Sequence, residues 1–190
     1  MKLRKMAAGL ALAAFAMMGS GGAGVQGQAA GVKASSPSSQ AAQYCRSTGG
    51  MSLVGIPYYG TNGGIPLQLA GQSSFCQYTA MDGSQATLLL STLVATLPSL
   101  AATAYYAQVP AGSCNGNPLS CYCTLLGGSD QFGGTTGAGG GWVFDGNFNN
   151  VLEACIFPDQ SSIDSGVLFY HSAGIIRGID LSTVLRYKNP

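Results

Sequence analysis

The stretch Tyr-Cys-Arg-Ser-Thr-Gly-Gly at residues 44–50 recurs 78 residues later as Tyr-Cys-Thr-Leu-Leu-Gly-Gly at residues 122–128. A further cysteine follows each stretch at nearly the same offset, Cys76 after the first and Cys155 after the second. Four matches in the same order indicate an internal duplication. The remaining matches are an apolar stretch in each half and the acidic turn before it, Asp82-Gly83-Ser84 or Asp159-Gln160-Ser161.

The duplication divides the chain into a first module at residues 41–110 and a second module at residues 111–190. We expect the α+β class, with two tandem disulfide-stapled helix–strand–strand–helix modules. The first helix of the second module has an N-cap and a helix-compatible proline in Asn117-Pro118, and Gly127 provides its stop. In the first module Ser36-Pro37 can start the equivalent helix, and a glycine ends it in the same way.

The rest of each module shows strand and helix signals. Apolar and β-branched runs between Gly- and Asn-rich loops predict strands. A serine before an apolar run predicts a helix N-terminus, so we expect Ser84 to cap a helix over Gln85–Leu97. A second late helix is expected to reach Ser172, with Ser161 or Ser162 as its cap. The predicted strands are Met51–Ile56, Ile65–Leu69, Ser74–Tyr78, Gly141–Phe144 and Leu152–Phe157.

The N-terminus has the pattern of a secretory signal peptide. Lys2, Arg4 and Lys5 precede an uncharged apolar run at residues 6–18, and small residues follow. This order predicts a Sec-type signal peptide over residues 1–30. Small polar residues predict a linker over residues 31–40. No cysteine lies near the expected cleavage position, so the chain has no lipobox, and we expect a secreted or periplasmic protein.

An even number of cysteines in an exported chain predicts disulfides. If equivalent positions of the two modules pair equivalently, the bridges are Cys45–Cys76 and Cys123–Cys155, which leaves Cys114–Cys121. Helix geometry agrees, because residues two apart on a helix point to nearly opposite sides. A metal site is the competing interpretation. The chain has no Cys-x-x-Cys and a single histidine, so we predict neither a metal nor another cofactor.

The charge of the chain argues against nucleic acid as a partner. The full sequence has a formal net charge of +1, and without the predicted signal peptide five basic and seven acidic residues remain. No basic patch exists that could neutralise a phosphate backbone.

The second module resembles a known family. Residues 117–128 follow Asn-Pro-Leu-Ser-Cys-Tyr-Cys-x-x-x-Gly-Gly, and residues 155–161 are Cys-Ile-Phe-Pro-Asp-Gln-Ser. This pattern resembles the small exported bacterial domains known as domain of unknown function 333, often labelled hemolysins, and the first module is similar more loosely. Gln160 stands at a family glycine, and Ile163 and Gly166 stand at its next cysteine and tryptophan. The resemblance implies an exported domain and brings no catalytic residues.

Four side chains are candidates for a binding site. Asp159, Ser161 and His171 have the residue types of a Ser–His–Asp hydrolase. No Gly-x-Ser-x-Gly elbow surrounds the serine, and Asp-x-Ser before an apolar run is more typical of a turn and a helix cap. Trp142, which follows the Gly-rich stretch 133–141, is either a hydrophobic plug or a ring on which a ligand stacks. We assign no catalytic residue.

One uncharged segment, Leu88–Tyr106, has close to the minimum length for crossing a membrane. Pro98 divides it and several Ser and Thr residues dilute it, so the sequence favours a packed helix pair over membrane insertion.

These patterns predict an exported cell-envelope or secreted protein that acts as a non-catalytic binding module for an envelope or extracellular ligand. The alternatives are a protease-inhibitor-like domain, because small stapled modules with Gly-rich loops present rigid loops well, and a membrane-active, hemolysin-like protein. A hydrolase that uses His171 is the fourth hypothesis.

Overall fold

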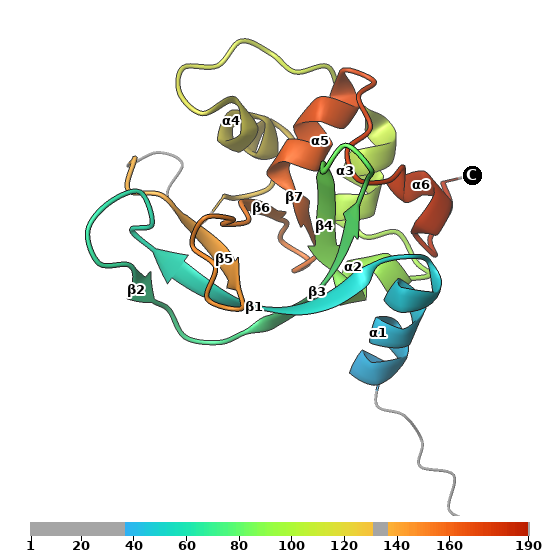
Figure 1. The fold of residues 1–190 in the computed structure, drawn as a ribbon. Helices are drawn as coiled ribbons and strands as arrows, with labels where there is room; N and C mark the ends of the chain where they lie inside the picture. The colour runs from blue at the N-terminus through green and yellow to red at the C-terminus, as the bar shows by residue number, and fades with distance from the viewer. Residues whose placement is uncertain (1–36, 131–136, 190) are drawn as a thin grey trace, which may run out of the picture. The chain divides into compact units, whose positions relative to one another are not determined.

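The computed structural model describes residues 37–130 and 137–189, whose fold is shown in Figure 1. The signal peptide predicted for residues 1–30, residues 31–36 of the predicted linker, and residues 133–136 of the Gly-rich stretch lie outside the described residues. Residues 37–40 of that linker belong to the first helix, α1 (Pro37–Ser47).

Helices and strands occur in both modules. In the first module α1 is followed by β1 (Met51–Tyr59), β2 (Leu67–Gln68), β3 (Ser73–Thr79), β4 (Gln85–Leu89), α2 (Leu90–Val94) and α3 (Leu100–Ala107). The second module contains α4 (Pro118–Leu125), β5 (Gly140–Phe144), β6 (Ala154–Ile156), β7 (Ser162–Asp164), α5 (Ser165–Ser172) and α6 (Leu181–Val184). The predicted α+β class is confirmed.

The strands form one antiparallel sheet that curls back on itself. Its order is β2-β1-β3-β4-β7-β6, and β5 pairs with β1 outside this path. Trp142 on β5 and Leu152, two residues before β6, exchange backbone hydrogen bonds of 2.9 Å in both directions. Because β5 pairs with β1 and bridges to the approach to β6, the strand pairing runs in a closed circuit through β1, β3, β4, β7, β6 and β5, here called the ring.

The ring separates two apolar clusters. The larger one lies between the sheet and the helices and takes residues from both modules, for example Leu88 and Leu93 of the first and Ile163 and Leu168 of the second. The smaller one contains Phe75, Phe144, Leu152 and Ala154. Strands β4 and β7 pair directly, with Leu88 opposite Ile163. The two modules therefore share one sheet and one core, and the module boundary near residue 110 falls in the connection between α3 and α4.

The cysteine pairs are those that the spacing predicts: Cys45–Cys76, Cys123–Cys155 and Cys114–Cys121. The first two pairs have equal surroundings. Gly50 donates a 2.9 Å hydrogen bond to the Cys45 carbonyl, and Gly128 donates one of the same length to the Cys123 carbonyl. All four sulfurs of these pairs belong to fully buried residues, so each bridge lies inside the core.

Each acidic turn accepts hydrogen bonds from backbone amides of the opposite predicted module. Ser161 Oγ accepts a 2.9 Å hydrogen bond from the Ala101 amide, and Asp159 Oδ2 accepts one of 2.8 Å from Leu100 at the start of α3. Ser84 Oγ accepts a 3.0 Å hydrogen bond from the amide of Gly178, which lies in the bend before α6. The cap prediction for Ser161 was right in kind and wrong in target, because the sequence alone does not show which helix end lies next to a turn. The cap prediction for Ser84 was wrong, because Ser84 accepts from a bend and not from a helix N-terminus.

The helix predicted over Gln85–Leu97 is wrong. Residues 85–89 form β4, a strand between β3 and β7 whose middle residues are buried, and only Leu90–Val94 are helical. The five residues of β4, Gln-Ala-Thr-Leu-Leu, are too few to distinguish a buried strand from the start of a helix by periodicity. The same difference occurs in the second module, where β7 precedes α5 and Asp164, rather than Ser161 or Ser162, is the N-cap.

The hydrogen bond from the Ala101 amide to Ser161 Oγ leads to a first prediction. We expect Ser161→Ala to lower the free energy of unfolding by about 1 kcal/mol, because it leaves the buried Ala101 amide at the N-terminus of α3 without an acceptor. Chemical denaturation of Ser161→Ala beside Ser91→Ala, which removes an exposed hydroxyl on α2, measures the difference. Equal midpoints for the two variants would contradict a capping role for Ser161.

Candidate functional site

The inner face of the ring has two layers of side chains. Because alternate residues of a strand point to the same face, a step of two residues along a strand leads from one layer to the next. On β3 this step leads from Gln77 to Phe75, and on β7 it leads from Asp164 to Ser162. The same step leads from Thr87 to Leu89 on β4 and from Phe144 to Trp142 on β5. One layer is therefore rich in polar groups and the other is mainly apolar.

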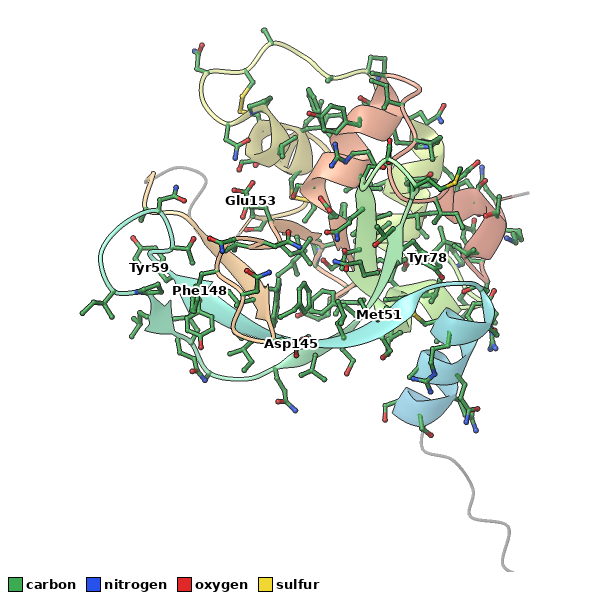
Figure 2. All side chains as sticks on the ribbon, in the orientation of Figure 1. Met51, Tyr59, Tyr78, Asp145, Phe148 and Glu153 are labelled. Carbon is green, nitrogen blue, oxygen red and sulfur yellow. A yellow bond between two sulfur atoms is a disulfide. The ribbon has the colours of Figure 1, made fainter. Side chains whose placement is uncertain are left out.

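The polar layer opens into a cavity of about 270 Å³. Phe144 and Leu152 belong to its apolar lining. Asn117, the residue before α4, also lines the cavity, although it belongs to none of the strands of the ring. Glu153 lies in the space between α4 and the sheet (Figure 2). Polar groups from both modules meet in this cavity: Gln77, Gln85, Thr87, Asn117, Asn150, Glu153 and Asp164.

Hydrogen bonds hold the amide side chains of this polar cavity in place. The Gln77 Nε2 group donates to Gln85 Oε1 and to Thr87 Oγ1, both at 3.3 Å. Asn150 Nδ2 donates to the same Gln85 oxygen at 3.2 Å. Because Gln77 and Thr87 are buried, this network fixes the direction in which the remaining donors and acceptors point.

Asp164 is the most perturbed acid of the polar cavity. Its Oδ1 accepts hydrogen bonds from the amides of Gly166 at 2.7 Å and Val167 at 3.4 Å, as the N-cap of α5. Burial nevertheless raises the pKa of Asp164 to about 6, and the nearby charge of Glu153 acts in the same direction. Desolvation of the carboxylate thus outweighs the two amide bonds and the attraction of Arg177, which lower the pKa.

Glu153 is perturbed in the same direction. Burial raises its pKa, and the charge of Asp130 adds to that effect. Asn117 opposes it by donating a 3.1 Å hydrogen bond from Nδ2 to Glu153 Oε2. Two carboxyl groups that hold their protons more tightly than usual therefore line one cavity, which is a pattern common at functional sites.

The Ser–His–Asp constellation that the fourth hypothesis requires does not assemble. Asp159 and Ser161 cap α3, whereas His171 is buried on α5, stacked on the Tyr105 ring at 3.8 Å. The His171 Nε2 atom lies 2.8 Å from Gln108 Nε2, and burial lowers the pKa of the imidazole. None of the hydrogen bonds between described residues joins His171 to Asp159 or Ser161. Asp159 and Ser161 cap α3, and His171 packs in the core against Tyr105.

Trp142 is the sequence candidate that does line a cavity. Its half-buried ring packs against Phe75 with the ring centroids 5.2 Å apart. It lines a second cavity, whose wall includes the side chains of the apolar layer of the ring. Sequence reasoning missed Asp164, Glu153 and the amides around them. The only sequence signal for Asp164 is the polar–apolar alternation of Ser162-Ile163-Asp164, which is too short to identify a strand.

Two absences concern the described residues. In residues 37–130 and 137–189, no three His, Cys, Asp or Glu side chains gather in a way that could hold a metal ion. Within the same residues no helix has the length and apolar character needed to cross a membrane. The segment Leu88–Tyr106 instead supplies the end of β4, the helix α2 and most of α3.

Comparison with known proteins returned no relative. No protein-family model, no curated protein and no solved structure matches this chain significantly.

Proposed function

We propose that this chain is an exported binding module whose polar cavity takes a neutral, hydroxyl-rich ligand such as a saccharide of the cell envelope. The observation that carries the proposal is the convergence of four amides, Thr87 and two carboxyl groups on one cavity of about 270 Å³. Ligand sites are concave and fix the orientation of the ligand with a few placed polar groups, and this cavity has both properties.

The chemistry of the lining favours saccharides over other polar ligands. Amide and carboxyl groups each present a donor and an acceptor, or two acceptors, in one plane, which suits neighbouring hydroxyls that both donate and accept. A carboxyl that keeps its proton, as the raised pKa of Asp164 favours near pH 6, adds a further donor. No basic side chain of the described residues lines the cavity, so an anionic ligand would find no charge partner among them.

Export rests on two further observations. The N-terminal sequence has the signal-peptide pattern, and the described residues contain three disulfides, which persist in oxidising compartments. The kinship with domain of unknown function 333 stays a prediction, as do the inhibitor-like and membrane-active alternatives, because no described contact bears on them.

The binding proposal is tested by titrating the isotopically labelled protein with chitotriose, cellotriose and maltotriose while its backbone amide resonances are followed. We expect at least one neutral trisaccharide to shift the amides of Thr87 and Asp164. The double variant Gln85→Ala/Asn150→Ala, which removes two amides that line the cavity, should weaken that binding about tenfold.

The matched control is Gln43→Ala, which removes an exposed amide on α1 and should leave the affinity unchanged. A sulfated disaccharide tests the charge argument and should bind more weakly than the neutral sugars. The proposal would be refuted if none of the trisaccharides shifted the resonances around Thr87 and Asp164.

A further inference from the structure

The second cavity of the ring is lined by other residues than the polar cavity. It has a volume of about 370 Å³ and lies against the apolar layer, two residues along each strand from the polar cavity. Its apolar lining includes Phe75, Leu89, Trp142 and Ile156. Among the described residues no charged side chain lines it, and the polar side chains that do are Ser73, Gln160 and Ser162.

Ser162 gives this cavity a polar group without a partner. Its residue is 1% exposed, and its hydroxyl makes no hydrogen bond to any described residue. The Ser162 amide, by contrast, is satisfied by Thr92 Oγ1 at 3.0 Å. A buried hydroxyl that stays unpaired costs about 1–3 kcal/mol in stability. A ligand that forms a hydrogen bond with the Ser162 hydroxyl would recover part of this cost.

Aromatic rings form one side of the same cavity. The rings of Phe75 and Trp142 meet at a tilt of 60°, and Phe75 also makes an edge contact with Phe144. Such contacts hold the Trp142 ring in one orientation at the cavity wall, where a further ring can stack on it or meet its edge.

We propose that this cavity, here called the Trp142 pocket, binds a small neutral aromatic molecule that carries a hydroxyl group. The ring of the ligand packs against Trp142 and Phe75, and its hydroxyl pairs with Ser162 Oγ. An ionised ligand is disfavoured because its charge would lose water and find no opposite charge in the lining. The Trp142 pocket does not depend on the saccharide proposal, since its walls and its ligand chemistry are its own.

The test uses the indole N–H resonance of Trp142, which is the single tryptophan of the chain. Benzyl alcohol, toluene and benzoate are titrated separately into the labelled full-length mature protein. We expect benzyl alcohol to shift the resonance at the lowest concentration and benzoate to need at least about tenfold more. We expect Ser162→Ala to weaken benzyl alcohol by about three- to tenfold and to leave toluene unchanged.

The Ser162→Ala variant also controls for folding. Because it removes a hydroxyl that is buried and unpaired, its denaturation midpoint should equal or exceed that of the wild type. Ser91→Ala is the matched hydroxyl deletion outside the pocket and should bind all three probes like the wild type. The proposal fails if benzyl alcohol leaves the indole resonance in place, or if Ser162→Ala binds benzyl alcohol as tightly as the wild type does.

Discussion

Gly128→Ala is expected to destabilise this protein by about 3 kcal/mol or more. A Cβ atom at Gly128 would overlap Cys155 Sγ and come within 2.9 Å of Cys123 Sγ, so the methyl group and the disulfide cannot occupy the same space. Neither sulfur can move aside, because both belong to fully buried residues. The variant must therefore shift the backbone between α4 and the sheet or lose the bridge.

Gly50→Ala should cost a similar amount for the same reason. Its Cβ would overlap Cys76 Sγ and approach Cys45 Sγ and the Tyr78 ring to 2.9 Å. Gly63→Ala is the matched control, because nothing lies within 4 Å of the added Cβ. Urea denaturation and mass spectrometry without reductant measure stability and bridge formation. If Gly50→Ala and Gly128→Ala matched Gly63→Ala in both measurements, the packing of glycine against each bridge would be refuted.

Asp164→Asn is expected to stabilise the protein at neutral pH by about 2 kcal/mol. The pKa of Asp164 in the folded state is about 6, above the ordinary value of about 3.9 for an aspartic acid in an unfolded chain. The folded state therefore holds this proton more tightly. The stabilisation is fully present below about pH 4, is lost as pH rises to about 6, and stays lost above.

Asparagine fits the site because it caps helices as well as aspartate does, so the bonds from Gly166 and Val167 can persist. The expected gain is smaller than the full shift in pKa implies, since Asp164 is only half-buried and water at the cavity screens its charge. The variant should also flatten the fall in stability between pH 4 and pH 6. Glu153 leaves a residual slope, because its pKa is raised too.

Denaturation midpoints of wild type, Asp164→Asn and Asp145→Asn across pH 4–8 provide the measurement. Asp145→Asn is the matched control, because it makes the same change of side chain at an exposed position in the turn after β5, outside the polar cavity. A parallel pH profile for Asp164→Asn and wild type would show that the carboxyl is not desolvated as the structure implies.

Local signals in the sequence predicted the parts of the fold that depend on neighbouring residues. Asn117-Pro118 starts α4 and Gly127 follows its end, as capping chemistry requires. The matched spacing of Cys45, Cys76, Cys123 and Cys155 also sufficed for the disulfide pairing, because a bridge needs only a partner and an oxidising compartment.

The elements that sequence reasoning missed are those whose identity depends on distant neighbours. Residues 85–89, Gln-Ala-Thr-Leu-Leu, are too few to show a clear period, and they form a strand because β3 and β7 pair with them on both sides. The targets of the acidic turns were missed for the same reason, since Ser161 and Ala101 are 60 residues apart in the chain.

Both cavities also depend on residues that are distant in the sequence. Asp164 and Thr87 lie far apart in sequence, and neither has a motif around it; closure of the ring places both on one wall. By itself the sequence determined the pairing of the cysteines and the start and end of α4. The pairing follows from the matched cysteine spacing, and the helix ends follow from the chemistry of neighbouring residues. Only the tertiary structure decided which side chains face the inside of the ring, because that depends on strand pairing across the two modules and on the burial that raises the pKa of Asp164.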